Sequence, residues 1–249
     1  MKAIKLECYK LRRKRLWLIA LAMGLTVALW MTVGLRDLDA DGRAEGFSDI
    51  LYQAPLLNSI VLPVFIAVLV SRSCDMEHKG GALKSLFTMQ TPESLFMAKL
   101  ALDGAYLLAA ILLQAASFLL IGRVCGFTEA LAPRELLLYV FSQWLVSMFL
   151  ALLIQILALR YVNQFIPMTV GLIGGFLGLM AMFFPPVVMR LAPSAYYGLL
   201  STVRMDWDSV TRTVDYYRVP FSLGDCALLC VAGLVLFIVG LRRFAKREV

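Results

Sequence analysis

The sequence predicts an all-α integral membrane protein with six transmembrane helices. Of its 249 residues, 61% are apolar and only 16% are charged, and the mean hydropathy is +0.79. A soluble domain has about 45–50% apolar and about 25% charged residues. The apolar residues also fall in runs of about 20, the length that crosses a hydrocarbon layer about 30 Å thick. Such runs must be helical, because lipid offers no partner for backbone N–H and C=O groups.

The first predicted span, Leu16–Leu35, follows a basic segment, residues 1–15. Within that segment Ile4, Cys8 and Leu11 share one helical face, which favours an N-terminal helix lying in the membrane interface. The alternative is a basic flank that only fixes the topology, and the two interpretations are compatible. The apolar run is too long for a secretory signal and no small-residue cleavage site follows it, so we expect the span to be retained.

Five further spans complete a single membrane domain over residues 1–249. Prolines in the second and fifth spans, such as Pro55, Pro63 and Pro185, predict kinks or broken helix ends, because proline removes a backbone hydrogen bond. The sixth span has the shortest apolar core. The five spans are Ile50–Val70, Leu100–Ile121, Leu136–Leu159, Phe165–Val188 and Leu223–Leu241.

The distribution of basic residues predicts which way the chain crosses the membrane. An even number of spans puts both termini on one side, and sixteen of the 24 Lys and Arg residues lie on that side. The first loop on the opposite side is acidic. Because cytoplasmic loops carry the excess of basic residues, both termini are predicted to be cytoplasmic. The same bias explains the net charge of +7 without a nucleic-acid partner.

The cytoplasmic segment between the second and third spans is the most informative part of the sequence. It contains Glu77, a pair of glycines at Gly80 and Gly81, and Leu83 and Leu86 on one side of a short helix. A short amphipathic helix in a cytoplasmic loop predicts a docking surface for a partner protein. The alternative is an interfacial helix that rests on lipid.

Polar residues inside the spans bear on the energy source of any transport. Those deep in the spans are neutral, namely Gln53, Asn58, Gln114, Gln143 and Gln155, and such side chains more often join helices than bind substrates. Ion-coupled transporters usually place ionisable residues near the membrane midplane. The pattern favours an external energy source, although an ion-coupled secondary transporter and a membrane scaffold that transports nothing stay as alternatives.

Enzyme, metal and cofactor sites find little support in the sequence. The only histidine is His78, and the five cysteines form no C-x-x-C pair, which predicts neither a zinc site nor a disulfide framework. The cluster from Cys74 to His78 could bind a metal, but a charged helix end beside the membrane explains it better. We therefore expect no catalytic residue, cofactor or metal.

The segment from Glu77 to Ala98-Lys99-Leu100 resembles the coupling-helix region of type-2 ABC transporter permeases. The start of the chain, with Glu7 ahead of a basic run, resembles the start of the same family. The resemblance implies the permease subunit of an ATP-driven exporter in a bacterial plasma membrane, with a second permease copy or a related permease beside it. It also implies that a cytoplasmic ABC ATPase docks at residues of about 75–90. The contact residues implied are Glu77, Gly80, Gly81, Leu83 and Leu86.

The ATPase is expected on a separate chain, since no G-x-x-x-x-G-K-[ST] motif is present. The nearest approach, Gly80-Gly81-Ala-Leu-Lys84-Ser85, lacks the glycine before the lysine.

A narrower resemblance covers the fifth span and the segment after it. The Gly-rich run and Leu191-Ala-Pro-Ser-Ala-Tyr-Tyr197 are similar to permeases of lantibiotic immunity and antimicrobial-peptide resistance, although many of those have Trp where this chain has Ser194. The resemblance implies an antimicrobial peptide as substrate. The glycines are spaced G-x-x-x-G, which predicts close helix packing within the subunit or at a subunit interface. They are Gly171, Gly174, Gly175 and Gly178.

The outer loop, residues 189–222, is rich in tyrosine and also holds Trp207. Aromatic side chains at a membrane interface usually fix the ends of helices against lipid. Contact with a peptide at the outer leaflet is the alternative role.

Overall fold

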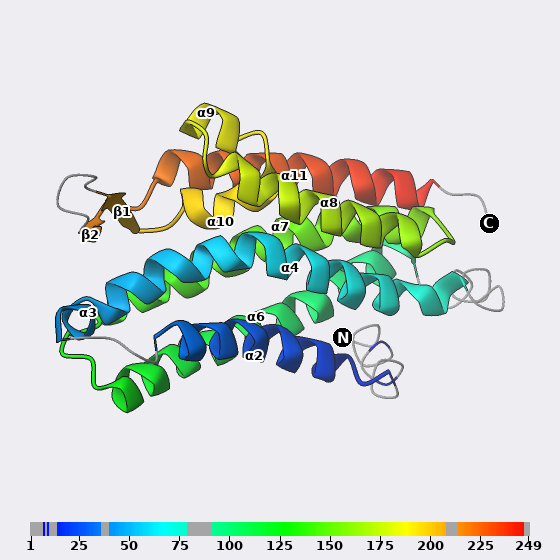
Figure 1. Cartoon of the computed structure of the whole chain (residues 1–249). Helices are drawn as coiled ribbons and strands as arrows, with labels where there is room; N and C mark the ends of the chain where they lie inside the picture. The colour runs from blue at the N-terminus through cyan, green and yellow to red at the C-terminus, as the bar shows by residue number, and fades with distance from the viewer. Residues whose placement is uncertain are drawn as a thin grey trace.

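The computed structural model describes residues 7, 9, 14–35, 40–78, 91–207 and 214–246. Six long helices run alongside one another in an elongated bundle (Figure 1). They are α2 (Leu16–Gly34), α4 (Gly46–His78), α6 (Pro92–Cys125), α7 (Pro133–Arg160), α8 (Phe165–Ala181) and α11 (Leu223–Ala245). The start of α2 and the end of α11 lie at one end, called here the termini end. The opposite end, called the hairpin end, holds the short helix α3 (Ala40–Ala44) and the strands β1 and β2.

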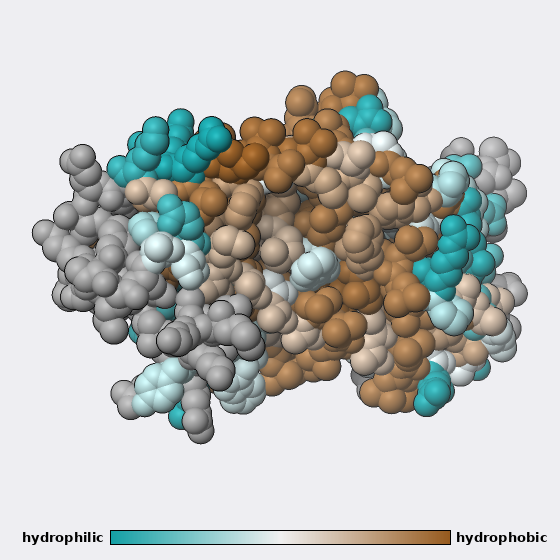
Figure 2. Space-filling model, turned by 180° about the vertical axis from the view of Figure 1, so that it is seen from behind, coloured by the Kyte–Doolittle hydropathy of each residue, from teal (hydrophilic) through white to brown (hydrophobic). Residues whose placement is uncertain are grey.

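Within the described part of the chain, five helices are long and apolar enough to cross a membrane: α2, α4, α6, α7 and α11. Figure 2 shows apolar side chains over the middle of one face and hydrophilic ones toward its two ends. Large apolar side chains are exposed along the bundle, among them Leu29 of α2, Leu120 of α6 and Val235 of α11. The chain is therefore a multi-pass membrane protein, as the sequence predicts.

Two helices extend well beyond the spans that hydropathy predicts. α4 has 33 residues and α6 has 34, so each is about 50 Å long against a hydrocarbon layer of about 30 Å. α6 begins early because Thr91 caps it, accepting a hydrogen bond from the Ser94 N–H at 3.3 Å, and Pro92 suits the first helical position. At the termini end both helices continue past their apolar cores.

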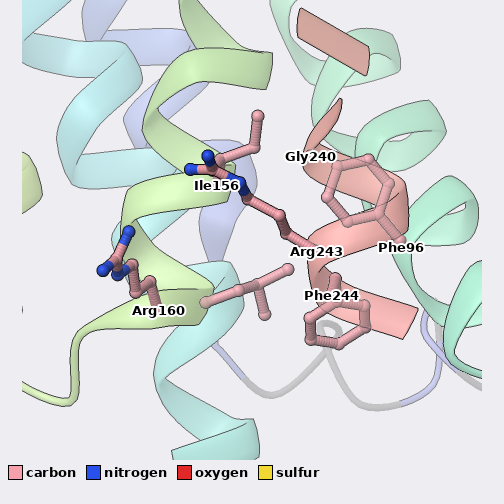
Figure 3. A pocket seen from close by; sticks show the side chains of 7 residues that line it. Phe96, Ile156, Arg160, Gly240, Arg243 and Phe244 are labelled. Carbon is pink, nitrogen blue, oxygen red and sulfur yellow. The ribbon is translucent and has the colours of Figure 1, made fainter. Parts of the chain in front are cut away.

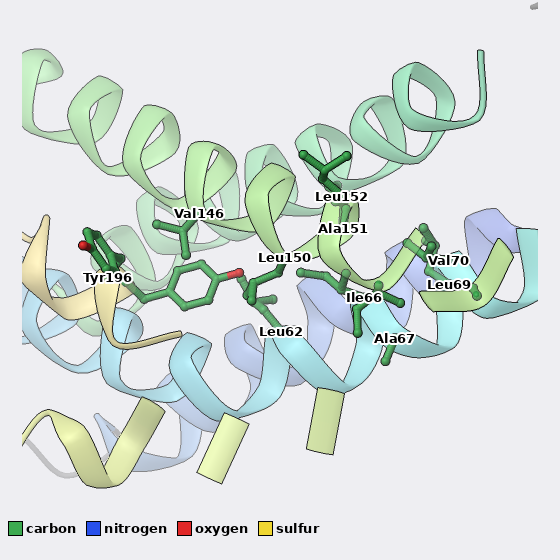
Figure 4. Packing of buried hydrophobic residues seen from close by; sticks show 14 of the residues in the cluster. Leu62, Ile66, Ala67, Leu69, Val70, Val146, Leu150, Ala151, Leu152 and Tyr196 are labelled. Carbon is green, nitrogen blue, oxygen red and sulfur yellow. The ribbon is translucent and has the colours of Figure 1, made fainter. Parts of the chain in front are cut away.

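The main core lies where α4 and α7 face each other. Figure 4 shows Leu62 and Ile66 of α4 pointing toward Val146 and Leu150 of α7, with Tyr196 closing one side. These five side chains are buried. Such packing leaves the outer helices α2 and α11 with most of their apolar surface turned outward.

The predicted fifth span, Phe165–Val188, is wrong in its last seven residues, because α8 ends at Ala181. Its 17 residues span only about 26 Å. Two prolines, Pro185 and Pro186, break the helix, since neither has an N–H and the residue before a proline avoids the α region. The chain then forms three short turns, α9 (Pro186–Met189), η2 (Pro193–Ala195) and α10 (Tyr196–Leu199).

The segment after α8 turns back along that helix instead of leaving the bundle. The Ser194 hydroxyl donates to the Gly174 carbonyl at 2.7 Å, two turns before α8 ends. Ser194, Ala195 and Tyr197 are buried. Irregular backbone is tolerated at membrane depth only where protein surrounds it, and α4, α7 and α8 supply that surrounding here.

A β-hairpin at the hairpin end departs from the predicted all-α class. β1 (Val203–Trp207) pairs antiparallel with β2 (Val214–Arg218), with Val203 opposite Arg218. Both strands lie in the predicted outer loop. Each has only five residues and includes charged ones, so the alternation of apolar and polar residues that is typical of a strand cannot be recognised in the sequence. The remainder of the described chain is helical or irregular, so the helical bundle stands.

Candidate functional site

The candidate site lies at the termini end, where the last turns of α4 and the first turns of α6 meet. The loop that joins them, residues 79–90, lies outside the described residues. Four of the predicted ATPase contacts, Gly80, Gly81, Leu83 and Leu86, fall in that loop. The fifth, Glu77, is in the last turn of α4 and is buried.

Lys99 of α6 is the centre of a buried ionic cluster. Its ammonium nitrogen lies 3.0 Å from Glu77 Oε1, 3.0 Å from Glu7 Oε2 and 2.9 Å from the Ser73 carbonyl oxygen. Lys99 and Glu7 are 0% exposed and Glu77 is 1% exposed. An ammonium group has three hydrogens, so the three acceptors match its donors. We call Glu7, Ser73, Glu77 and Lys99 the Lys99 cluster.

The Lys99 cluster joins three parts of the chain that are far apart in sequence. Glu7 belongs to the segment before α2, Ser73 and Glu77 belong to α4, and Lys99 belongs to α6. Burying ions is costly, and the cost is offset only when each charge is paired and hydrogen-bonded. The pairing therefore holds the two flanks of the 79–90 loop and the N-terminal segment in one arrangement.

Two further buried groups lie beside the cluster. Asp103 follows Lys99 by four residues on α6, so the two side chains share one helix face, and Asp103 is 0% exposed. Cys74 is also fully buried and follows Ser73 on α4. With Asp103 included, three carboxyl groups lie near a single lysine, which makes this the most acidic interior region that the described residues form.

A hydrogen bond extends the same arrangement to α7. The Gln155 side-chain amide donates to the Phe96 carbonyl oxygen at 2.9 Å, and both residues are buried. Phe96 is one turn before Lys99, so the first turns of α6 are held by α4 on one side and by α7 on the other. A displacement of the first turns of α6 would therefore also displace the parts of α4 and α7 that are bonded to them.

A second polar network lies midway along the bundle. The Asn58 amide of α4 donates to Tyr139 OH at 3.0 Å and to Gln143 Oε1 at 2.9 Å, both on α7. It also contacts Gln114 Oε1 of α6 at 3.3 Å. Gln143 in turn donates to the Tyr197 carbonyl at 3.2 Å. These side chains are buried and bond to one another, so they join α4, α6, α7 and α10 instead of lining an open path.

The glycines of α8 pack against segments of the same chain. A Cβ at Gly171 would lie 2.4 Å from the Ala67 Cβ, and one at Gly175 would lie 2.9 Å from the Ile60 carbonyl oxygen, both on α4. A Cβ at Gly178 would lie 2.3 Å from the Ser194 Cβ. Gly174 has no heavy atom closer than 3.8 Å to that position. Three of the four glycines therefore sit where backbones approach closely.

Contacts at the hairpin end hold the β-hairpin on the bundle. Tyr216 of β2 donates to Asp49 near the start of α4 at 2.6 Å. Glu129, in the loop between α6 and α7, accepts from the Ser48 N–H at 2.8 Å and pairs with Arg218 at 3.2 Å. A carboxylate at the first turn of a helix suits its partial positive charge. The hairpin, the α6–α7 loop and α4 thus form one unit.

The sequence pattern points to Glu77 and the polar residues of the spans, but it predicts a partner protein as the contact of Glu77. Lys99, which pairs with Glu77 in the structure, directly precedes the predicted third span, and the sequence pattern assigns it no role of its own. One signal could have pointed to it, because a lysine adjoining an apolar run needs a carboxylate. The identity of Glu7 as the second partner could not follow from spacing, since 92 positions separate the two residues.

The architecture described above is that of a multi-pass membrane protein. Comparison with family models adds the identification: the model described as "ABC-2 family transporter protein" matches residues 3–178. The match covers well over half of the chain, and the chain belongs to this family. A comparison with curated proteins gives no match. Members are the non-catalytic transmembrane permeases of ABC exporters, and membership implies association with a separate cytoplasmic ABC ATPase.

Proposed function

We propose that the chain is the permease through which an ABC ATPase drives export, and that the Lys99 cluster passes the motion of the ATPase to the spans. The ATPase docks on the 79–90 loop, at Gly80, Gly81, Leu83 and Leu86, and Glu77, buried in the last turn of α4, joins this surface to Lys99. The observation that supports this is the position of Lys99, which lies on the α6 flank of that loop and pairs with the α4 flank and with the N-terminal segment. A push on the loop then reaches α4 and α6 together.

The proposal includes an orientation, with both termini, the Lys99 cluster and the loop in the cytoplasm of a bacterial cell and the hairpin end outside. A variant without the five native cysteines tests it with one new cysteine at a time. Thr91→Cys, at the α6 cap, should react with a membrane-impermeant maleimide only after the cells are opened. Thr128→Cys, exposed at the hairpin end, should react in intact cells. The opposite pattern would refute the orientation.

The substrate we propose is an antimicrobial peptide, cleared from the outer leaflet or the membrane for self-protection or resistance. The support is the resemblance of the fifth span and of Leu191–Tyr197 to immunity permeases. The permease works beside a second copy or a related permease. Expression with the ABC ATPase encoded beside its gene should raise the minimal inhibitory concentration of a lantibiotic such as nisin. An unchanged value across several lantibiotics, with both subunits present, would overturn this part.

Docking and transmission need separate tests. Leu83→Glu or Leu86→Glu should release the co-expressed ATPase from the tagged permease, because a charge disrupts an apolar contact, while membrane insertion stays intact. Lys99→Gln removes the buried cation, so it is assayed below its own melting temperature. Under those conditions it should retain the ATPase, since Lys99 is buried and does not lie on the docking surface. It should nevertheless lower transport-linked ATP hydrolysis in proteoliposomes by about tenfold or more, the effect of about 1.4 kcal/mol in coupling.

The control for the transmission test is Arg123→Gln, which removes an exposed charge at the opposite end of α6. It should change neither ATPase retention nor hydrolysis. Full hydrolysis and transport in the Lys99→Gln variant would remove the cluster from the mechanism. Undisturbed ATPase binding in both leucine variants would refute the docking surface.

A further inference from the structure

A cavity that the transport proposal does not use lies at the termini end, between α6, α7 and α11. Its volume is about 630 Å³, within the range of about 300–1,000 Å³ that is usual for ligand pockets. Apolar side chains form most of its wall, and two arginines, Arg160 and Arg243, complete it. The apolar lining consists of Phe96, Ile156, Leu159, Gly240 and Phe244.

The two arginines come from the last turns of different helices. Arg160 ends α7 and Arg243 lies in the last turn of α11. Figure 3 shows the Arg243 side chain extending from α11 toward α7, on which Arg160 lies. Both residues are exposed, and neither forms an ion pair with another described residue. Two guanidinium groups at the rim of an apolar cavity favour an anion that carries an apolar tail.

Gly240 of α11 packs closely against Ile156 of α7 at the cavity. A Cβ at that position would lie 2.4 Å from Ile156 Cδ1 and 2.7 Å from its Cγ1. The glycine therefore lets α7 and α11 approach closely here. A larger residue at 240 would collide with Ile156, which itself lines the cavity, and would displace that side chain.

The surroundings of the cavity indicate lipid. α11 is the least buried of the five helices long enough to span a membrane, and Val235, Ile238 and Val239, in the turns before the cavity, are exposed. Hydrocarbon is the natural environment of these side chains. The arginines lie at the helix ends, where lipid headgroups begin.

We propose that this cavity binds one anionic phospholipid from the leaflet at the termini end. The phosphate lies between Arg160 and Arg243, and an acyl chain lies along Phe96, Ile156 and Phe244. Phospholipids and soluble phosphate esters both carry the phosphate that the arginines would bind. The apolar wall favours the phospholipid, because only a lipid has an acyl chain to place along it. This site depends only on the chain being a membrane protein, so its failure would leave the transport proposal untouched.

The test is native mass spectrometry of the detergent-solubilised full chain with added dioleoyl phosphatidylglycerol. The wild-type chain should retain one lipid at concentrations where dioleoyl phosphatidylcholine is not retained. Arg160→Gln combined with Arg243→Gln should weaken retention about 25-fold, about fivefold for each guanidinium removed. Gly240→Leu should also weaken it, because the leucine displaces Ile156 from its place in the cavity wall. The two arginines are exposed at helix ends and Gly240 is buried, so a melting curve checks that each variant is folded.

The matched control is Arg242→Gln, which removes an exposed arginine adjacent to Arg243 that does not line the cavity. Its retention should equal that of the wild type. Equal weakening by Arg242→Gln and by the double variant would mean adventitious, surface-wide attraction and would overturn the site. Complete displacement of the lipid by excess glycerol phosphate would overturn it too, because a soluble phosphate would then suffice.

Discussion

Lys99 illustrates how a single residue can fix the arrangement of several helices. Three partners surround its ammonium group at 2.9–3.0 Å, and water is excluded from all of them. Such a cluster adds little net stability over a well-packed apolar one, but it penalises every arrangement in which a charge loses its partner. At this scale its value is specificity, because α4, α6 and the N-terminal segment are held in one register.

Lys99→Met should destabilise the protein by about 3–5 kcal/mol, because Glu7 and Glu77 would each lose the buried cation that lies 3.0 Å away. Thermal unfolding in detergent micelles, followed by circular dichroism, measures the change. The triple variant Glu7→Gln, Glu77→Gln, Lys99→Met should recover most of the loss, since the two carboxylates that Lys99 neutralises are then removed together with it. A triple variant as unstable as the single one would show that packing around Lys99, and not charge pairing, is responsible.

Asn58 has a similar role at the middle of the bundle. Asn58→Leu should destabilise the protein by about 1–3 kcal/mol, because Tyr139, Gln143 and Gln114 lose a shared donor or acceptor inside the membrane. Gln53→Leu is the control, since Gln53 bonds to the near end of its own helix. Equal unfolding temperatures for the two variants would contradict this role.

At the scale of elements, α8 shows how glycine sets the distance between two helices. Gly175→Ala should destabilise by about 1–3 kcal/mol, because the new methyl group would meet the Ile60 backbone, which cannot move without shifting α4. Gly174→Ala is the matched control one residue away. Its methyl group meets nothing closer than 3.8 Å, and alanine favours the helix by about 0.5–1 kcal/mol. Equal melting temperatures would contradict the predicted close approach.

The cores of the helices could be predicted from the sequence, but their ends could not. Runs of apolar residues identify α2, α4, α6, α7 and α11, since crossing lipid requires them. The early start of α6 depends on a polar cap at Thr91, and the end of α8 depends on Pro185 in the midst of apolar residues. A hydropathy profile detects neither the capping bond nor the residue at which α8 ends.

At the scale of the whole molecule, the hairpin end forms a closed unit through contacts between distant segments. Burial and the neighbouring Asp49 carboxylate raise the pKa of the Tyr216 phenol above its usual value of about 10. Because the unfolded tyrosine loses its proton first, the stabilisation is present below about pH 10 and is lost as the pH rises beyond it.

Hydrogen exchange in the two strands, Val203–Trp207 and Val214–Arg218, should therefore be protected equally at pH 6 and pH 9, after correction for the intrinsic exchange rate. Tyr216→Phe should increase exchange there about fivefold or more, the effect of one lost hydrogen bond of about 1 kcal/mol. Tyr217→Phe, on the neighbouring exposed residue, should not. Equal protection in both variants would show that strand pairing alone holds the hairpin.

The candidate site could be foreseen only in part. The importance of the segment around Glu77 follows from its place between two spans, and the structure puts Glu77 beside Lys99. The choice of Glu7 as the second partner depends on the fold of the whole bundle, because nothing near Lys99 in the sequence points to it. The cavity beside Arg160 and Arg243 likewise exists only once three helices come together.

The short turns after α8 also bear on how the protein is made. Residues 193–199 are too few to enter lipid as an independent helix, and they are held in the bundle by bonds to α7 and α8. The Gln143 amide donates to the Tyr197 carbonyl, and the Ser194 hydroxyl donates to the Gly174 carbonyl. During biosynthesis this stretch can be buried only after α4, α7 and α8, which precede it in the chain, have been inserted and have packed together. A chain whose α7 fails to insert, because charged residues replace part of its apolar core, should thus leave this stretch accessible to protease, whereas the wild-type chain should protect it. Its burial would then be one of the last steps in the folding of the protein.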